Sequence, residues 1–193
     1  MEIDCVLASS SPRRRELLSK IGVSFTVDPA GIDETQRPGE SPYHLVRRLA
    51  AAKAVAVALR HPHSLVIGSD TVVAQGGEVF GKPGSQANAF AMLERLSGKA
   101  HQVYTAVAVW SACEARGLVR VAIADVVFRP LSTDEIAAYV QTREPLDKAG
   151  GYAIQGQAGA WVQNFRGDQE TVIGLPTTVV QALLTHFPRS CGG

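Results

Sequence analysis

Hydrophobic and polar positions change period several times along the chain, and these changes predict its secondary structure. Up to residue 74, short β-branched apolar runs alternate with stretches in which apolar residues recur every three to four positions, the spacings of strands and helices. Ser11 and Ser41 each precede a proline, a pair that begins helices. The elements expected here are a strand at 3–8, a helix at 12–21, a strand at 24–28, a loop to 40, a helix at 42–59 and a strand at 65–74.

After residue 74 the pattern changes to turns, paired strands and further helices. "QGGEVFGKP" predicts a turn and a short return strand, while "HQVYTAVAVW" and "LVRVAIADVVF" flank the turn-like "SACEARG" as the two arms of a hairpin do. Ser132 with Glu135 three residues later has the pattern of a capping box at a helix start. The other expected elements are a helix at 85–97, short strands within the glycine-rich segment 150–174 and a closing helix over "PTTVVQALLTHF".

This order of elements favours an α/β fold. Because helices and strands alternate early and hairpins follow, we expect a mixed β-sheet with flanking helices rather than a purely doubly wound parallel sheet. No repeat, linker or low-complexity run divides the sequence, so residues 1–193 are interpreted as one domain. We expect it to have two lobes around a cleft.

Composition agrees with a soluble globule. Hydrophobic residues make up 46% of the chain and charged residues 19%, and no stretch approaches the roughly 18 continuous apolar residues of a membrane span. The first residues lack the basic and apolar regions of a secretory signal, which favours a cytoplasmic protein without membrane partners. Cys5, Cys113 and Cys191 are far apart and odd in number, so we expect free thiols, with Cys5 buried.

Charge excludes one class of partner. With 19 basic and 18 acidic residues the net charge is +1, which gives no broad cationic surface for duplex nucleic acid. Any recognition of anions must therefore be local.

The arginine run at residues 13–15 is a candidate for such local recognition. With Ser11 as the cap, these arginines fall in the first turn of a helix, where the helix dipole is already positive and each cation costs about 0.3 to 1 kcal/mol. A phosphate that meets the free N–H groups and the guanidinium groups would remove this conflict. The alternative is three solvated surface arginines.

Asp70 and Lys53 interrupt apolar patterns. Strand alternation places Asp70 on the face of Val66 and Val72, where an unpaired carboxylate is costly and needs a cation or a hydrogen-bond donor. Lys53 falls within the apolar arc of the helix at 42–59. The alternatives are that Asp70 caps a turn at a frayed strand end and that Lys53 reaches around the rim of the helix to water.

Two further charged residues lie in expected loops or strand ends. Glu34 in "GIDETQRPGE" and Lys82 in "FGKP" are candidates because functional groups concentrate in loops, although each alone is typical of a surface. "GGEVFGK" at residues 76–82 imitates the start of a P-loop, but Pro83 replaces the hydroxyl residue that binds magnesium. We therefore reject a P-loop.

Eight motifs together resemble the Maf family of nucleoside triphosphate pyrophosphatases. They lie in the family's order over nearly the whole chain and read "LASSSPRRRELL", "GIDET", "RLAAAKA", "IGSDTVV", "GKP", "LSGKAHQVYTAVAV", "PLDKAGGYAIQG" and "VIGLP". The resemblance implies an elongated, twisted mixed sheet like that of inosine triphosphate pyrophosphatases, a deep cleft and, in many members, a homodimer. It also implies hydrolysis of a nucleoside triphosphate to the monophosphate and pyrophosphate with a divalent metal, usually Mg²⁺, with Mn²⁺ or Co²⁺ as other candidates.

The resemblance also implies roles for individual residues. Glu34 and Asp70 would hold the metal and orient or deprotonate water, and the base could be either of them. The residues that would grip the triphosphate are Ser9, Arg13, Arg14, Lys53 and Lys82.

Three positions resemble the branch of the family that acts on dTTP and UTP. The chain has Arg13, Thr71 and Gln155 where the branch that acts on 7-methyl-GTP typically has Trp, Gln and Glu. A glutamine amide can donate to a pyrimidine carbonyl and accept from the ring N3–H. Modified pyrimidine nucleotides are also candidate substrates. The alternative function is a non-catalytic regulator of cell division that binds nucleotide or nucleic acid, although aromatic residues, at 6%, are few for stacking on single strands.

Overall fold

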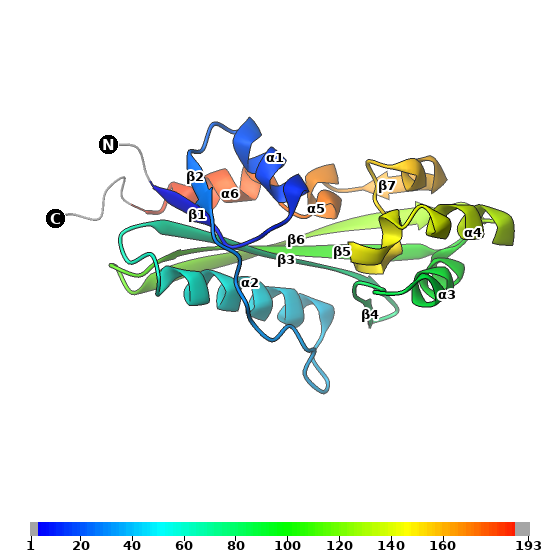
Figure 1. Ribbon diagram of the computed structural model, residues 1–193, viewed down its shortest axis with the longest axis horizontal. Helices are drawn as coiled ribbons and strands as arrows, with labels where there is room; N and C mark the ends of the chain where they lie inside the picture. Colours follow the sequence, from blue (N-terminus) through cyan, green and yellow to red (C-terminus); the bar gives the residue numbers. More distant parts are fainter. Residues whose placement is uncertain (1–3, 188–193) are drawn as a thin grey trace. The chain divides into compact units, whose positions relative to one another are not determined.

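A computed structural model describes residues 4–187, which form an α/β fold with one seven-stranded sheet (Figure 1). The strand order is β2-β1-β3-β5-β6-β7, and β4 pairs with β3 at the side of this path. β1 is parallel to both β2 and β3, whereas the pairs β3–β4 and β6–β7 are antiparallel, so the expected mixed sheet is confirmed. The strands are β1 (Cys5–Leu7), β2 (Phe25–Val27), β3 (Leu65–Gln75), β4 (Glu78–Phe80), β5 (Ala100–Ser111), β6 (Arg116–Phe128) and β7 (Val162–Arg166).

The helices begin where the capping signals place them. Ser11, Ser41 and Ser132 each accept a hydrogen bond from a backbone N–H of the first turn, and the capping box of Ser132 and Glu135 is complete. The helices are α1 (Pro12–Lys20), α2 (Pro42–Ala58), α3 (Gln86–Leu96), α4 (Thr133–Gln141), α5 (Gln169–Ile173) and α6 (Thr177–Leu184), with 3₁₀ turns η1 (Glu144–Asp147), η2 (Ala149–Gly151) and η3 (Gln157–Trp161).

The chain divides into two compact units. Unit 1 comprises Met1–Asp70, Thr105–Ala122 and Gly174–Gly193, and unit 2 comprises Thr71–Tyr104 and Ile123–Ile173. Strands β3, β5 and β6 each contribute residues to both units. The division agrees with the expectation of two lobes.

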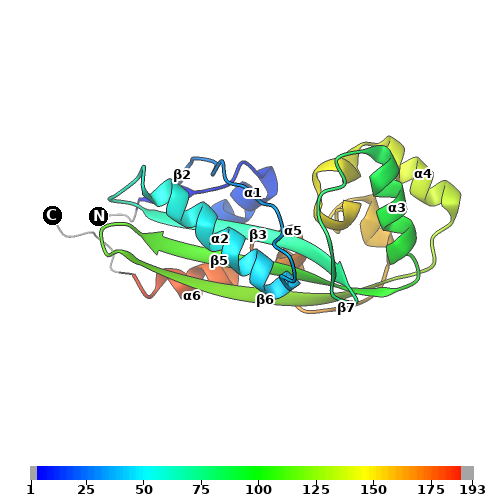
Figure 2. The same ribbon diagram turned by 90° about the horizontal axis from the view of Figure 1, so that it is seen from below.

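In unit 1, helices cover both faces of the sheet. Figures 1 and 2 show α2 on one face and α1 and α6 on the other. Gly68 of β3 allows α2 to approach closely, because a Cβ there would lie 2.4 Å from the carbonyl oxygen of Ala50. This contact sets the distance between the helix and the strand.

The core of unit 2 is built around aromatic rings. α3 and α4 pack together, and the rings of His101, Tyr152, Trp161 and Tyr139 lie with Phe128 in a chain of edge-to-face contacts. Such pairs add about 0.5 to 1.5 kcal/mol each beyond the area they bury.

Two expectations about local structure are wrong. The segment 150–174 holds one strand, β7, while 3₁₀ turns and the short helix α5 replace the other expected strands, because Gly150 and Gly151 have positive φ and interrupt extended backbone. Cys113 is disulfide-bonded rather than free. Cys5 is a free, buried thiol as expected, and Cys191 lies outside the described residues.

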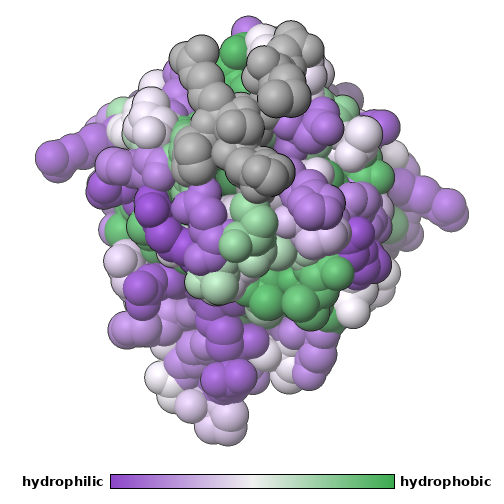
Figure 3. All heavy atoms as spheres, turned by 90° about the vertical axis from the view of Figure 1, so that its left-hand side faces the viewer, coloured by the Kyte–Doolittle hydropathy of each residue, from purple (hydrophilic) through white to green (hydrophobic). Residues whose placement is uncertain are grey.

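No helix between residues 4 and 187 is long and apolar enough to cross a membrane. Figure 3 shows one end of unit 1, where hydrophilic residues surround a limited hydrophobic area. The most exposed large apolar side chain among the described residues is Leu59, with 78% of its surface accessible.

Candidate functional site

A buried ion pair joins α2 and β3 in unit 1. Asp70 occupies the interior of β3 and is 5% exposed, and Lys53 of α2 is 7% exposed. The Lys53 Nζ atom lies 2.7 Å from Asp70 Oδ1. The two alternatives, a frayed strand end and a lysine that reaches water, are therefore wrong. Removing either partner would leave the other charge buried, which costs about 3 to 5 kcal/mol in comparable pairs.

Glu34 adds a second carboxylate to this pair. It lies in the loop between β2 and α2, and its Oε1 atom is 3.1 Å from Lys53 Nζ. The Glu34 side chain is 48% exposed, in contrast to the buried Asp70. One ammonium group thus bridges an accessible and an inaccessible carboxylate.

The protonation of Asp70 is set by opposing effects. Burial raises the pKa of the Asp70 carboxyl above its ordinary value, while the charges of Lys53 and Arg14 act to lower it, and Glu34 adds a smaller upward contribution. A carboxylate with a raised pKa binds a proton more readily than an ordinary aspartate. Asp70 is therefore suited to accept a proton.

Arg14 joins three segments of unit 1. Its Nε atom donates to the carbonyl oxygen of Gly174 at 2.9 Å, and Nη1 donates to the carbonyl oxygen of Ser69 at 2.9 Å and to Ser9 Oγ at 3.2 Å. Burial lowers the pKa of the Arg14 guanidinium, and Asp70 and Glu34 oppose this change. The Arg14 guanidinium group therefore donates to two backbone carbonyl oxygens.

Sequence reasoning missed two residues of this network. The hydroxyl of Ser69, which is fully buried, donates to the carbonyl oxygen of Gly174 at 2.9 Å. Gly174 therefore accepts from both Ser69 and Arg14, at a backbone position with φ of 117° that favours glycine. The sequence signal that could have identified Ser69 is its hydroxyl within an apolar strand, since a buried hydroxyl needs a hydrogen-bond acceptor.

The start of α1 lies beside this network. Ser9 Oγ accepts from the backbone N–H of Ser11 at 3.3 Å as well as from Arg14. Arg13, one residue before Arg14, is partly buried. Unit 1 thus brings together Ser9, Arg14, Glu34, Lys53 and Asp70.

The three remaining predicted site residues belong to unit 2. Thr71 directly follows Asp70 in β3 and is partly buried. Lys82 is exposed after β4, and Gln155 is exposed between η2 and η3. The sequence 76–82 forms the turn and strand of the β3–β4 hairpin, which confirms the rejection of a P-loop.

The carboxylates of unit 1 match the donor chemistry of a hard divalent cation. Over residues 4–187 there is no group of three or more His, Cys, Asp or Glu side chains that could hold a metal by themselves. Mg²⁺, however, is commonly held by one or two carboxylates together with substrate phosphates. Glu34 and Asp70, which meet at Lys53, fit that kind of site.

Comparison with known proteins identifies the family. Residues 4–187 match the family model of Maf-like proteins. A dTTP/UTP pyrophosphatase of Symbiobacterium thermophilum is 48% identical over 190 residues, which are 97% of each chain, and one of Myxococcus xanthus is 50% identical over 179 residues, 93% of this chain and 90% of the relative. The structure of the Staphylococcus aureus Ham1 protein superposes with a TM-score of 0.52 at 16% sequence identity, and the match covers 95% of this chain and 98% of the Ham1 chain. This similarity supports the fold. The chain is therefore a member of the Maf family.

Proposed function

We propose that the chain is a nucleoside triphosphate pyrophosphatase that hydrolyses dTTP and UTP to the monophosphate and pyrophosphate. The observation that carries this proposal is the buried Lys53–Asp70 pair with Glu34 on the same ammonium group. The names of relatives about half identical over nearly the whole chain support the substrate class.

The proposed chemistry needs a proton acceptor and charge neutralisation. An oxygen of water forms a bond to phosphorus, the bond that joins the α-phosphate to the leaving pyrophosphate breaks, and a proton of the water passes to a carboxylate. Asp70 is one candidate acceptor because burial raises its pKa, and Glu34 is the other because it is accessible. A divalent cation held by Glu34 and Asp70, Mg²⁺ or alternatively Mn²⁺ or Co²⁺, would neutralise phosphate charge when bound.

The cationic side chains would bind the triphosphate. Lys53 contacts both carboxylates and presents an ammonium group next to them. Arg13 and Lys82 would add charge to the phosphates, as would Ser9 with its hydroxyl. Arg14, which donates to the carbonyl oxygens of Ser69 and Gly174, would mainly fix the start of α1 against β3.

Pyrimidine preference would depend on Gln155. This side chain is exposed, and its amide can donate to a pyrimidine carbonyl and accept from N3–H. Thr71 and Arg13 differ from the residues typical of the methylguanine branch, and Arg13 would repel a cationic base.

A nucleotide panel tests this function. We expect release of pyrophosphate, not orthophosphate, from dTTP and UTP with Mg²⁺, and much slower release from purine nucleotides. Asp70→Asn should lower kcat by about 10² to 10⁴, the usual contribution of a general base, and metal coordination would add to that loss. The matched control is Asp125→Asn, a partly exposed strand aspartate of β6 that accepts from Gln102, and it should keep the wild-type rate. An unchanged rate in Asp70→Asn would contradict the proposed site.

A further inference from the structure

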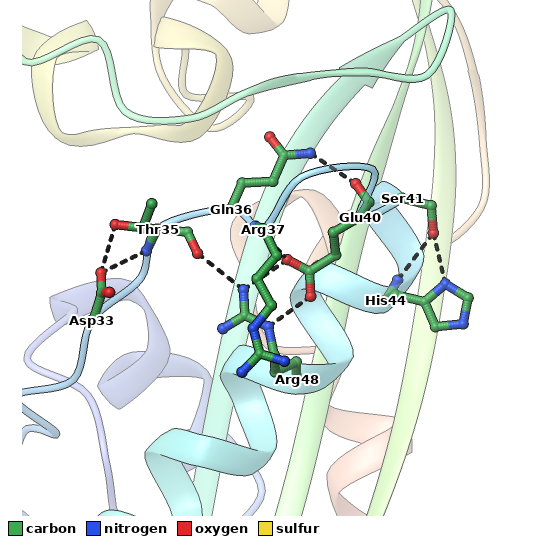
Figure 4. Close-up of polar contacts among 8 residues, drawn as sticks. All are labelled: Asp33, Thr35, Gln36, Arg37, Glu40, Ser41, His44 and Arg48. Atoms are coloured by element: carbon green, nitrogen blue, oxygen red, sulfur yellow. Dashed lines mark hydrogen bonds and ion pairs between the residues drawn. The ribbon is translucent and has the colours of Figure 1, made fainter.

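The loop that carries Glu34 is attached to α2 through Arg48 (Figure 4). Arg48 Nε lies 2.6 Å from Glu40 Oε1 and Nη2 lies 2.7 Å from Glu40 Oε2, so the guanidinium and the carboxylate meet through two parallel hydrogen bonds. Nη2 also donates to the carbonyl oxygen of Thr35 at 3.1 Å. A single side chain of the helix thus holds the loop at two points.

Local hydrogen bonds fold the loop into two turns around these points. Asp33 Oδ1 accepts from the backbone N–H and the hydroxyl of Thr35 at 2.9 and 2.6 Å. In the second turn the Gln36 amide donates to the carbonyl oxygen of Glu40 at 2.8 Å, and Glu40 Oε2 accepts from the backbone N–H of Arg37 at 3.1 Å. Arg48 binds both turns, as the two sets of dashed lines in Figure 4 show.

Glu34 precedes Thr35 directly, so α2 contacts this pair of residues through two side chains. Lys53 contacts the Glu34 side chain, and Arg48 binds the Thr35 carbonyl. The contact between Lys53 and Glu34 alone is weak, because ion pairs with an exposed partner contribute little to stability. The Arg48–Glu40 pair is better shielded, with the two side chains 22% and 9% exposed.

The Arg48–Glu40 pair also persists over a wide pH range. Hydrogen bonds from Arg48 lower the pKa of Glu40 to about 2. The carboxylate therefore stays ionised throughout the range in which the enzyme would be assayed.

We infer that Arg48 is a positioning residue that holds Glu34 beside Lys53 and Asp70 through its paired contacts with Glu40 and Thr35. The inference rests on the proposed function, in which Glu34 takes part in the reaction. Arg48 lies more than one helical turn before Lys53 on α2. It contacts the loop and not the residues predicted to bind phosphate.

The test compares Arg48→Met, Arg48→Lys and Glu40→Gln with wild type, each in the whole 193-residue chain. Arg48→Met should lower kcat for pyrophosphate release from UTP by about 10- to 100-fold, the usual effect of losing a group that orients a site residue. KM for UTP should change by no more than about threefold, since no nucleotide contact is removed. Arg48→Lys should recover only part of kcat, because an ammonium group keeps the charge but cannot form the paired contact. Glu40→Gln, which keeps one acceptor, should lie between wild type and Arg48→Met.

Hydrogen exchange supplies a readout independent of activity. Backbone amides of residues 33–41 should exchange faster in Arg48→Met than in wild type, with the core of unit 2 unchanged. The control is Arg95→Met, which removes a similar two-bond pair with Glu78 in unit 2 and should keep both kcat and loop exchange at wild-type values.

Each outcome decides one question. Wild-type kcat or wild-type loop exchange in Arg48→Met would overturn the positioning role. If wild type released no pyrophosphate from any nucleotide, the proposed function would fail instead, and loop exchange in Arg48→Lys and Glu40→Gln would still show whether Arg48 holds the loop. Those two milder variants also serve if Arg48→Met does not fold.

Discussion

His101 couples the stability of unit 2 to pH. It lies in β5, is 3% exposed, and its Nε2 atom is 2.9 Å from the hydroxyl oxygen of Tyr152. Burial lowers the pKa of His101 from 6.5 to about 4. The unfolded chain therefore takes up this proton at a higher pH than the folded chain does, and the stability due to neutral His101 is complete above about pH 6.5 and lost as the pH falls toward 4.

Replacement of His101 should flatten this dependence. From pH 7 to 4.5 the free energy of unfolding of wild type should fall by up to about 3 kcal/mol through this one group, at 1.36 kcal/mol per pKa unit. His101→Gln should be less stable at pH 7 but lose less on acidification, as denaturant titrations at several pH values would measure. The control is His63→Gln, at an exposed position, which should keep the wild-type dependence of the free energy of unfolding on pH. Equal slopes for wild type and His101→Gln would contradict this origin of the pH dependence.

Single charged residues in apolar patterns were the informative signals at the residue scale. Asp70 and Lys53 could each be singled out from the sequence because their neighbours predict burial. The ion pair between them could not be predicted from the sequence, since it depends on how closely α2 packs on β3. Arg14 could be placed at the start of a helix, but its acceptors, Ser69 and Gly174, come from segments 55 and 160 residues away.

At the scale of elements, Gly68 controls the distance between α2 and β3. A Cβ at this position would lie 2.4 Å from the Ala50 carbonyl oxygen and 2.8 Å from the Ala54 backbone nitrogen. Gly68→Ala should therefore displace the helix and destabilise the protein by about 1 to 3 kcal/mol or more, the range for overpacked contacts. Lys53 moves with α2 and Asp70 with β3, so pyrophosphate release should fall as well.

Thermal unfolding and kcat measure the two effects. Gly31→Ala is the matched control in unit 1, because a Cβ there meets nothing within 4 Å, and its melting temperature should stay close to wild type. An equally stable Gly68→Ala would show that α2 and β3 can adjust to the added methyl group.

Elements with local signals could be predicted well, and those without could not. Caps at Ser11, Ser41 and Ser132 depend on neighbouring residues alone, and each lies where the sequence placed it. In the segment 150–174, 3₁₀ turns replace most of the expected strands, and they depend on glycines such as Gly150, which has positive φ and where a Cβ would lie 2.7 Å from Val73 Cγ2. The closing helix is also shorter than the apolar pattern suggested, since α6 ends at Leu184.

At the scale of the whole molecule, the periodicity of the sequence does not indicate that separate stretches of the chain combine into two units. Three strands contribute to both units, and unit 1 is assembled from three separate stretches of sequence. Contacts between such stretches depend on tertiary packing, which periodicity does not report. The predicted ligands consequently divide between the units, with Lys82 and Gln155 in unit 2 and the carboxylates in unit 1.

Binding of a nucleotide with metal should stabilise the folded chain as a whole. A ligand that binds only the folded state at 100 times its Kd adds about 2.7 kcal/mol, which raises the melting temperature of a chain of this size by roughly 5 to 10 °C. We expect this shift with Mg²⁺ and a UTP analogue whose α,β-bridging oxygen is replaced by an imido group, so that hydrolysis does not consume it. The shift should be much smaller with EDTA, because phosphates and the carboxylates of Glu34 and Asp70 then repel each other.

Single-stranded DNA distinguishes the enzyme from a nucleic-acid-binding regulator. At the same phosphate concentration it should neither raise the melting temperature comparably nor displace the analogue, since 19 basic residues are offset by 18 acidic ones. The corresponding ATP analogue is the control for base recognition and should give a smaller shift than the UTP analogue. Displacement of the UTP analogue by DNA, with a larger shift in melting temperature, would favour the regulator, because a site built for one triphosphate offers a polymer no additional contacts.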